Sequence, residues 1–412
     1  MNIGIFTDTY YPQINGVVTS INLLEKELTR RGHNVYIFTS TDPNADLEAE
    51  KGSVFRFPSL PFIFFPERRL AVAGLFTLSR LVNRLDIDVI HTHTEFSLGM
   101  MGIFAAKKHD LPIVHTYHTM YEDYLHYIGN GKFVTPATVR KASRSYCNRM
   151  DKTIVPSEKV KTVLENYGIR SEIRVIPTGT DFSQFEPQKQ QLREVKQLKA
   201  ELGITEGPVL LSIGRLSQEK NIEAILQAMP AILKEHPAAK LVIVGDGPIK
   251  KQLAELAGIL QIEGSIVFTG AVPWQEVNKF YQLGDLFISA STSETQGLTL
   301  AEAIASKTTV VAKADPSLDT LVVDGESGFV YPSDDALAGA VINALSDEVY
   351  LKRMAVAAFE KSQFLSVASF GDSVIDVYRE VAAEKAQVKL YPEAAKHTSR
   401  RRWMRSLFML GK

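Results

Sequence analysis

Several features of common protein classes are missing from this chain of 412 residues. Its single cysteine, Cys147, cannot form an internal disulfide and suits a reducing compartment, and no Cys/His spacing predicts a zinc site. No run approaches the roughly 18 consecutive apolar residues that a bilayer-spanning helix needs. A formal net charge of −1 argues against a protein that coats nucleic acid, so we expect no nucleic-acid partner. The start, MNIGIFTDTYYP, lacks the basic and apolar stretches of a secretory signal, and we expect the protein to stay inside the cell.

What the chain does have is an alternation of strand and helix patterns that occurs twice. Short apolar segments such as NIGIF (2–6) and PIVHTYH (112–118) alternate with amphipathic stretches, which predicts parallel βαβ units. The pattern restarts at PVLLSIG (208–214) and continues through KLVIVGDG, DLFIS and TTVVA. We therefore predict an α/β protein with two doubly wound, Rossmann-like domains, over residues 1–185 and 186–367. A ligand is expected in the cleft where both sheets present their strand ends.

Two glutamates, Glu294 and Glu302, lie in the segment SETQGLTLAEAIA (293–305). A buried strand is predicted just before it, Gly297 permits a turn, and the residues that follow are strong helix formers, so a helix should begin near Gly297. The free N–H groups of a helix start suit phosphate oxygens. We expect Glu302 to accept hydrogen bonds from ribose hydroxyls and Glu294 to meet the group beyond the phosphates. The other residues expected in this donor site are Gln296, Gly297, Leu298 and Thr299.

A pair of cations leaves the first strand of the second domain in GRLSQEKN, which begins at Gly214. The guanidinium of Arg215 can bind phosphate oxygens with two parallel hydrogen bonds, and Lys220 adds a point charge, so the pair suits a diphosphate leaving group. Taken alone, such a pair would more often form surface salt bridges. The predicted anion site near Gly297 favours the phosphate interpretation.

In the first domain, Asn15-Gly16 precedes a predicted helix, which gives a second helix start at the cleft. Gly16 either allows close approach to the diphosphate or simply makes the turn. Asp8, at the end of the first strand, either orients an acceptor hydroxyl or caps the turn. His118 ends another strand, where it could donate to a sugar hydroxyl, whereas His91 and His115 are expected to be satisfied core residues.

Neither domain carries the GxGxxG pattern, which disfavours a dinucleotide-dependent dehydrogenase. The nearest approach is Gly245-Asp246-Gly247-Pro248, where the third glycine is missing. These glycines either lie beside a nucleotide base or form a strand-ending turn. Both alternatives remain open from the sequence.

Together these motifs resemble the retaining glycosyltransferases of the GT-B fold, in the family four group. The resemblance rests on the Asn15-Gly16 loop, His118, IPTGTD (176–181), GRLSQEKN, GDGP and the two glutamates, in the family's order over nearly the whole chain. It implies that Glu294 contacts donor sugar hydroxyls, Glu302 the ribose, and His118 the transferred sugar, while Arg215 and Lys220 hold the diphosphate. It also implies a crossover helix over 368–385 that returns to the first domain.

Two departures from the family pattern are visible. IPTGTD has threonine where asparagine is frequent, and NGVV (15–18) has one glycine where many members have two. No carboxylate is placed as a nucleophile. Asp86-Ile87-Asp88 is predicted to be a helix-to-strand turn, so we expect no tightly bound metal or cofactor, with a UDP-sugar as co-substrate and Mg²⁺ as a possible stimulator.

The acceptor must be inferred from the first domain and the basic aromatic tail, residues 386–412. The segment LPFIFFP (60–66) is predicted to be a loop that dips into lipid, with a buried strand as the alternative. Basic residues of 124–150 and a short tail helix are expected to meet anionic headgroups, with a solvated face and a disordered tail as alternatives. The acceptor or membrane residues predicted here, besides Asp8, are Phe62, Phe64, Phe65, Arg68, Arg69, Arg140, Lys141, Arg144 and Trp403.

Within this group the opening MNIGIFTDTYYPQINGVVTSI most resembles the diacylglycerol glucosyltransferases of Gram-positive bacteria. The resemblance implies transfer of glucose from UDP-glucose to diacylglycerol by a peripheral protein at the cytoplasmic face of the membrane, in contact with anionic lipids. Galactose, a glycolipid or soluble acceptor, a UDP-sugar 2-epimerase and a catalytically inactive binding module remain as alternatives.

Overall fold

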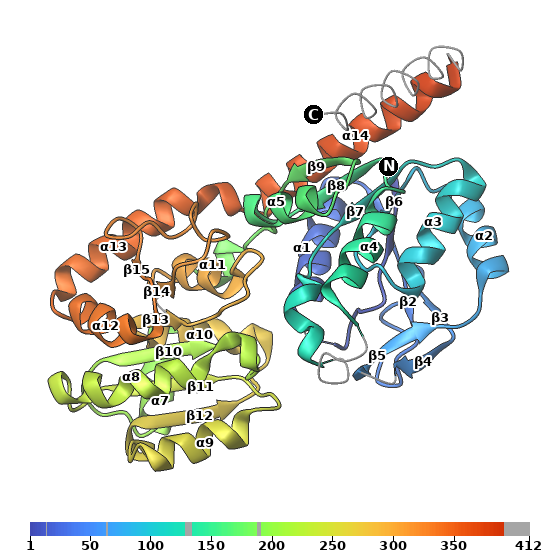
Figure 1. Cartoon of the computed structure of the whole chain (residues 1–412). Helices are drawn as coiled ribbons and strands as arrows, with labels where there is room; N and C mark the ends of the chain where they lie inside the picture. The colour runs from blue at the N-terminus through green and yellow to red at the C-terminus, as the bar shows by residue number, and fades with distance from the viewer. Residues whose placement is uncertain (14, 63–64, 128–133, 188–190, 391–412) are drawn as a thin grey trace.

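The structure is a computed structural model that describes residues 1–13, 15–62, 65–127, 134–187 and 191–390. Two α/β domains lie side by side, and the last helix runs back along the first domain (Figure 1). Each domain has one parallel sheet with helices packed against it. The predicted fold of two Rossmann-like domains is confirmed.

The first sheet has the order β3-β2-β1-β6-β7-β8-β9, and every neighbouring pair is parallel. Its central strands VIHT and IVHT are buried at every residue, which is typical of sheets covered by helices on each side. The strands are β1 (Asn2–Phe6), β2 (Asn34–Ser40), β3 (Val54–Phe57), β6 (Val89–Thr92), β7 (Ile113–Thr116), β8 (Lys152–Val155) and β9 (Glu172–Val175). The helices are α1 (Gly16–Arg30), α2 (Leu75–Arg84), α3 (Ser97–His109), α4 (Pro136–Cys147) and α5 (Glu158–Asn166), and the short α6 (Phe182–Phe185) after β9 packs against the second domain.

The second sheet has the order β12-β11-β10-β13-β14-β15 and is also parallel throughout. Its strands are β10 (Val209–Ile213), β11 (Lys240–Val244), β12 (Ile266–Gly270), β13 (Leu286–Ser289), β14 (Thr309–Lys313) and β15 (Phe329–Tyr331). Its helices are α7 (Gln191–Glu201), α8 (Ile222–Glu235), α9 (Lys250–Ile259), α10 (Val277–Leu283), α11 (Leu298–Ala305), α12 (Leu337–Leu345) and α13 (Glu348–Lys361). Short 3₁₀ helices cover Tyr121–Tyr127, Gln218–Lys220, Glu263–Ser265, Trp274–Glu276, Asp334–Ala336 and Ser362–Leu365.

The last helix, α14 (Val367–Leu390), belongs to the core of the first domain. Tyr378 is fully buried there, and its hydroxyl lies 2.6 Å from Nδ1 of His91. The nearly buried ammonium of Lys152 on β8 lies 2.6 Å from the carboxylate of Glu380. The predicted return of the C-terminal helix to the first domain is therefore confirmed.

An antiparallel hairpin of β4 (Ser59–Phe62) and β5 (Phe65–Ala71) extends from the first domain. The prediction of a loop at 60–66 is wrong for its described part, because Pro61 is paired opposite Arg69 within this two-stranded sheet. Both strands are edge strands, where the missing N–H of proline is tolerated. Leu60 is 61% exposed, so the buried-strand alternative is also wrong at this position.

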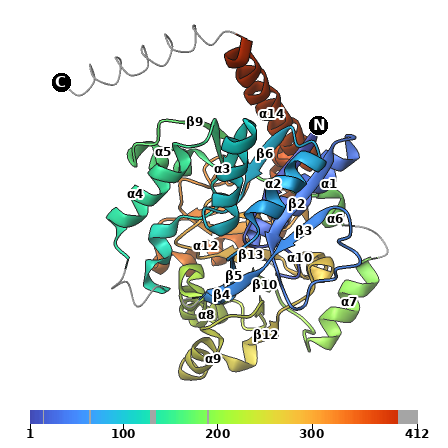
Figure 2. The same cartoon turned by 90° about the vertical axis from the view of Figure 1, so that its right-hand side faces the viewer.

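Figure 2 looks at the first domain, where α2 and α3 lie side by side. Among the described residues, none of the helices has the length and apolar character needed to cross a bilayer.

Candidate functional site

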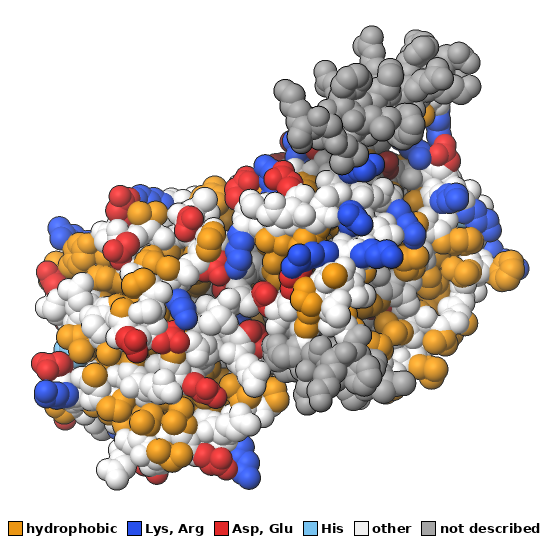
Figure 3. Space-filling model, in the orientation of Figure 1, with side chains coloured by type: hydrophobic (Ala, Val, Ile, Leu, Met, Phe, Trp, Pro, Cys, Tyr) orange, Lys and Arg blue, Asp and Glu red, His pale blue; other side chains and the backbone are white. Residues whose placement is uncertain are grey.

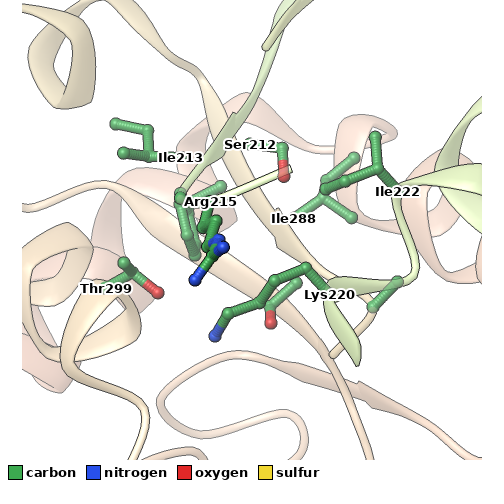
Figure 4. A pocket seen from close by; sticks show the side chains of 11 residues that line it. Ser212, Ile213, Arg215, Lys220, Ile222, Ile288 and Thr299 are labelled. Atoms are coloured by element: carbon green, nitrogen blue, oxygen red, sulfur yellow. The ribbon is translucent and has the colours of Figure 1, made fainter. Parts of the chain in front are cut away.

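The two predicted cations lie together in a pocket at the ends of β10 and β13 (Figure 4). Gly214 has a φ of 151° at the end of β10, and the chain then presents Arg215, which is exposed, and Lys220. Thr299, from the first turn of α11, lines the same pocket. Two cations and a helix start therefore share one site, which is suited to a diphosphate.

The start of α11 depends on Gly297, which has a φ of 79°. A Cβ atom at this position would lie 2.6 Å from Cδ2 of Leu318, so that side chain would have to shift, and the left-handed backbone is what requires glycine here. The N–H groups of Leu298 and Thr299 precede the first hydrogen bond of the helix, which the Leu300 N–H donates to the Gly297 carbonyl at 3.0 Å. The predicted helix boundary is confirmed.

The two glutamates have different surroundings. Glu294 is 7% exposed, and its carboxylate lies 2.6 Å from the ammonium of Lys220. Glu302 accepts a hydrogen bond of 2.7 Å from the hydroxyl of Tyr281, and burial raises its pKa to about 7. Glu302 lines a second hollow, with Leu298 and Thr180 among its neighbours, rather than the pocket of the cations. Thus the structure joins Glu294 to the cationic pocket and places Glu302 on the other side of the α11 start.

The helix start of the first domain faces that of the second. A Cβ atom on Gly16 would lie 3.5 Å from Cδ1 of Leu298, an ordinary contact, so α1 and α11 begin close together across the domain boundary. The Asn15 side chain accepts hydrogen bonds from the N–H groups of Val17 and Val18, both at 3.1 Å. These donors are already capped, which leaves fewer free N–H groups at α1 than at α11.

His118 follows β7 and is half-buried, with its Nε2 atom 2.9 Å from Nδ1 of His93. Burial lowers the pKa of His118 to about 3 and that of His93 well below its usual value, so both rings are neutral at pH 7. His91 and His115 are fully buried, and their ring nitrogens lie within hydrogen-bonding distance of partners such as Thr116 Oγ1, at 2.7 Å from His91. The expectation that these two histidines are satisfied core residues is confirmed.

The glycines of GDGP have a packing role. A Cβ atom on Gly245 would lie 1.9 Å from the carbonyl oxygen of Gly214, and one on Gly247 would lie 2.2 Å from that of Leu216. The loop after β11 therefore passes directly against the loop after β10, which carries Arg215. This contact explains both glycines as parts of a strand-ending turn, and their role beside a nucleotide base stays a prediction.

Asp8 follows β1, and its carboxylate contacts the start of α3. Its buried carboxylate accepts hydrogen bonds from the Ser97 hydroxyl, the Thr94 hydroxyl at 2.6 Å and the Leu98 N–H at 3.0 Å. Three internal donors thus occupy this carboxylate. Of the two roles considered for Asp8, the structure favours capping, here of a helix, over the orientation of an acceptor.

Gln296 was predicted to bind the donor, but its side chain joins the domains. Its Oε1 atom accepts from the N–H of Thr178 at 2.7 Å, and its Nε2 atom donates to the carbonyl of Thr178 at 2.8 Å. With 6% of the residue exposed, its amide has no open side toward the cationic pocket. The side chain therefore fixes the loop before Gly297 to the segment that follows β9.

The structure describes some of the predicted membrane residues, on the β4–β5 hairpin and on α4. Arg69 donates to the hydroxyl and carbonyl of Ser59 at 3.0 and 2.8 Å, and Phe62 is half-buried. On α4, Arg140 pairs with Glu122 at 2.7 Å, whereas Lys141 and Arg144 are exposed. Phe64 and Trp403 lie outside the described residues, as do the side chains of Phe65 and Arg68.

Sequence reasoning missed a group of residues that bind the Glu294 loop from the other domain. Lys159, at the start of α5, donates to the Glu294 carbonyl at 3.0 Å and pairs with Asp315 at 2.7 Å. Ser157 donates to the Thr295 carbonyl at 2.6 Å. Ser157 has the helix-capping pattern that the sequence displays, but no spacing pattern links it to a loop 138 residues away.

Within the described ranges, no three side chains of His, Cys, Asp or Glu come together as a metal site. Asp86 and Asp88 lie between the end of α2 and the start of β6, as predicted for a turn.

Comparison with known proteins agrees with this two-domain site. Residues 14–184 match the model of Glycosyltransferase Family 4, and residues 194–361 match that of Glycosyl transferases group 1. The chain is 43% identical over 379 residues to an alpha-monoglucosyldiacylglycerol synthase of Streptococcus pneumoniae, covering 92% of this chain and 85% of that protein. It is 34% identical over 351 residues to an alpha-monoglucosyldiacylglycerol synthase of Acholeplasma laidlawii, covering 83% and 88% of the two chains.

A solved structure with the same fold is that of Anabaena Alr3699/HepE in complex with UDP-glucose. It superposes with a TM-score of 0.75 at 19% identity and covers 92% of this chain and 100% of that one. The fold, the two family models and the identities together settle the family. The chain belongs to the GT-B glycosyltransferases, in the family that includes the alpha-monoglucosyldiacylglycerol synthases.

Proposed function

We propose that this glycosyltransferase moves glucose from UDP-glucose onto the free hydroxyl of 1,2-diacylglycerol and makes an α-glucosyldiacylglycerol. The observation that carries the proposal is the 43% identity, over 92% of this chain, to a protein named for that product. The pocket of Arg215 and Lys220 beside the start of α11 supports a nucleotide diphosphate as the leaving group.

The chemical step breaks the bond between the anomeric carbon and the diphosphate. Negative charge grows on the departing phosphate while the sugar becomes similar to an oxocarbenium ion. Arg215, Lys220 and the first N–H groups of α11 are placed to stabilise that charge. The acceptor hydroxyl attacks from the face that the diphosphate leaves and gives its proton to the departing phosphate oxygen, and attack on this face retains the α configuration.

The remaining donor contacts are assigned to three side chains. Glu294 contacts sugar hydroxyls and is held near Lys220 by their ion pair of 2.6 Å. Glu302 accepts from the ribose, and neutral His118 forms a hydrogen bond with the transferred sugar. No carboxylate is assigned as a nucleophile in this scheme, and the Glu294 carboxylate serves to contact the sugar while it pairs with Lys220.

Mg²⁺ enters the proposal only as a stimulator. It would act by neutralising diphosphate or anionic lipid in solution. Activity that persists at a reduced level in excess EDTA agrees with this role, and complete, Mg²⁺-reversible loss contradicts it.

The enzyme is proposed to act as a peripheral protein on the cytoplasmic face of the membrane. The exposed basic residues Lys141 and Arg144 on α4 would attract anionic headgroups.

A second element of the proposed contact is the apolar flank, which we define as Leu60, Val72, Leu75, Phe76, Met100 and Phe104. Phe76 at the start of α2 is 86% exposed. Figure 3 shows hydrophobic side chains, with lysines and arginines beside them, on the part of the first domain where Figure 1 draws α2 and α3. Exposed apolar groups beside cations are typical of surfaces that enter the interface of an anionic bilayer.

The test is incubation with a panel of UDP-sugars and vesicles that contain diacylglycerol, with and without anionic lipid. We expect glucose transfer from UDP-glucose to be the fastest reaction and to increase with anionic lipid. Equal rates on diacylglycerol in neutral and in anionic vesicles would contradict the membrane part of the proposal.

The same panel separates the alternatives. A glycolipid or a soluble acceptor would be glycosylated in place of diacylglycerol, and a preference for UDP-galactose would replace glucose as the hexose. A UDP-sugar 2-epimerase would release an altered nucleotide sugar without any acceptor.

A further inference from the structure

The loop that carries Glu294 is bound along its whole length by groups outside the second sheet. Ser293 donates to the carboxylate of Asp123 in the first domain. The carbonyls of Glu294 and Thr295 accept from Lys159 and Ser157 at 3.0 and 2.6 Å, and Gln296 is paired with the backbone of Thr178. Every residue from 293 to 296 therefore has a hydrogen bond to the first domain or to the segment that follows it.

Lys159 is the cationic member of this set. Its ammonium donates to both carboxylate oxygens of Asp315, at 3.0 and 2.7 Å, and to the Glu294 carbonyl, so all three of its N–H groups are used. The Lys159 side chain is 20% exposed and that of Asp315 is 9% exposed. Asp315 also accepts from the N–H and hydroxyl of Ser317, which fixes its carboxylate after β14.

The contacts of Lys159 couple the closure of the two domains to the position of the Glu294 backbone. The ion pair joins α5 of the first domain to the second domain, and the third N–H group holds the backbone of the residue that meets the donor. When the domains separate, the ion pair between Lys159 and Asp315 is broken, and the Glu294 carbonyl loses a charged donor. Both lost contacts favour the closed arrangement, and removing Lys159 alone would leave the Asp315 carboxylate shielded and without its partner in that arrangement.

We propose that Lys159 is a positioning residue, which makes closure of the two domains and the placement of Glu294 a single step. The proposal rests on the proposed function only in taking Glu294 as a donor contact. Lys159 itself touches no substrate. It acts through the backbone of residue 294 and through Asp315, and a misplacement of about 1 Å at a reacting centre can reduce the rate on the order of 100-fold.

The variant that tests this is Lys159→Met, which keeps most of the side-chain stem and removes the charge. We expect kcat to fall about 10- to 100-fold. The Kd for UDP should change by less than about threefold, because Arg215, Lys220 and the α11 start all belong to the second domain. The matched control is Lys161→Met, two residues along the same helix, where the lysine forms a more exposed pair with Glu158 at 3.4 Å. It should leave kcat and Kd unchanged.

A conformational measurement separates positioning from a general loss of structure. Since the only cysteine, Cys147, is buried, spin labels can be placed at Ser145→Cys on α4 and Gln252→Cys on α9, both exposed positions in opposite domains. With saturating UDP, the parent should give a narrow distance distribution, and Lys159→Met a broader or longer one. This measurement needs no acceptor, so a failure of diacylglycerol glucosylation would not affect it.

A second variant, Asp315→Asn, protects the test against misfolding of the first. It should reproduce the fall in kcat and the broader distance distribution. Full kcat in either variant, or an unchanged distance distribution in both, would overturn the proposal. A loss of UDP affinity equal to the loss of kcat would also overturn it, because that result indicates damage to the second domain.

Discussion

The ionisation of Glu302 gives the most quantitative prediction of the structure. Burial raises the pKa of this carboxyl from 4.5 to about 7, although the Tyr281 hydroxyl donates to it at 2.7 Å. Because the pKa of the folded state lies above that of the unfolded state, the contribution to stability is complete below about pH 4.5 and is lost as the pH rises through about 7. Glu302→Gln stays neutral throughout and avoids this loss.

The size of the effect follows from the shift. Each pKa unit corresponds to about 1.36 kcal/mol, so a shift of this size is worth roughly 2 to 3 kcal/mol. Relative to the parent, Glu302→Gln should therefore gain roughly 2 to 3 kcal/mol of unfolding free energy between about pH 4.5 and pH 8.

Tryptophan fluorescence provides the assay. The chain has two tryptophans, Trp274 and Trp403, and in a Trp403→Phe background the signal reports on Trp274, which lines the same hollow as Glu302. Urea unfolding is followed at several pH values. Glu255→Gln, which changes an exposed carboxylate on α9, is the control and should show no pH-dependent gain. A constant stability difference between Glu302→Gln and the parent across this range would refute the reasoning.

Three further predictions concern the cationic pocket, the glycine contact and the membrane surface. Arg215→Ala should raise the activation barrier by about 2 to 4 kcal/mol in steady-state kinetics. Its control, Lys251→Ala at an exposed position on α9, should leave the barrier unchanged. Near-normal turnover in Arg215→Ala would contradict the phosphate assignment. Gly247→Ala should destabilise the second domain by about 1 to 3 kcal/mol in denaturant unfolding, because its Cβ would lie 2.2 Å from the Leu216 carbonyl oxygen. An unchanged unfolding midpoint would show that the loops after β10 and β11 separate easily. The double variant Lys141→Ala/Arg144→Ala should lose about 2 kcal/mol of binding to anionic vesicles at low salt in a sedimentation assay, and equal binding by variant and parent would exclude α4 from the contact.

The fold and the cationic pocket were predictable because they depend on local patterns. Runs such as LFIS (286–289) are buried on both faces of a parallel sheet, and parallel strands place their following loops at one edge. Gly297 marked the start of α11 because its left-handed backbone favours glycine. Arg215 and Lys220 then had to lie close to that helix start.

Other features depend on contacts between distant segments, which no local pattern displays. Lys159 and Asp315 are 156 residues apart, and Gln296 meets Thr178 over 118 residues, so their pairing was not predictable from spacing. The hairpin at 59–71 was missed because proline argues against a strand in the interior of a sheet, whereas both of its strands are edges. The Tyr281 hydroxyl that donates to Glu302 belongs to another helix, 21 residues away in the sequence.

Identification of the reaction product tests the central claim most directly. The enzyme is incubated with UDP-glucose and anionic vesicles containing 1,2-diacylglycerol, and the lipid product is purified and characterised by mass spectrometry and by the NMR signal of its anomeric proton. We predict one glucose in α linkage to the diacylglycerol hydroxyl, formed with release of UDP and strongly reduced in Arg215→Ala. A β-linked lipid, a glycosylated soluble acceptor in place of the lipid, or an epimerised UDP-sugar formed without acceptor would contradict it.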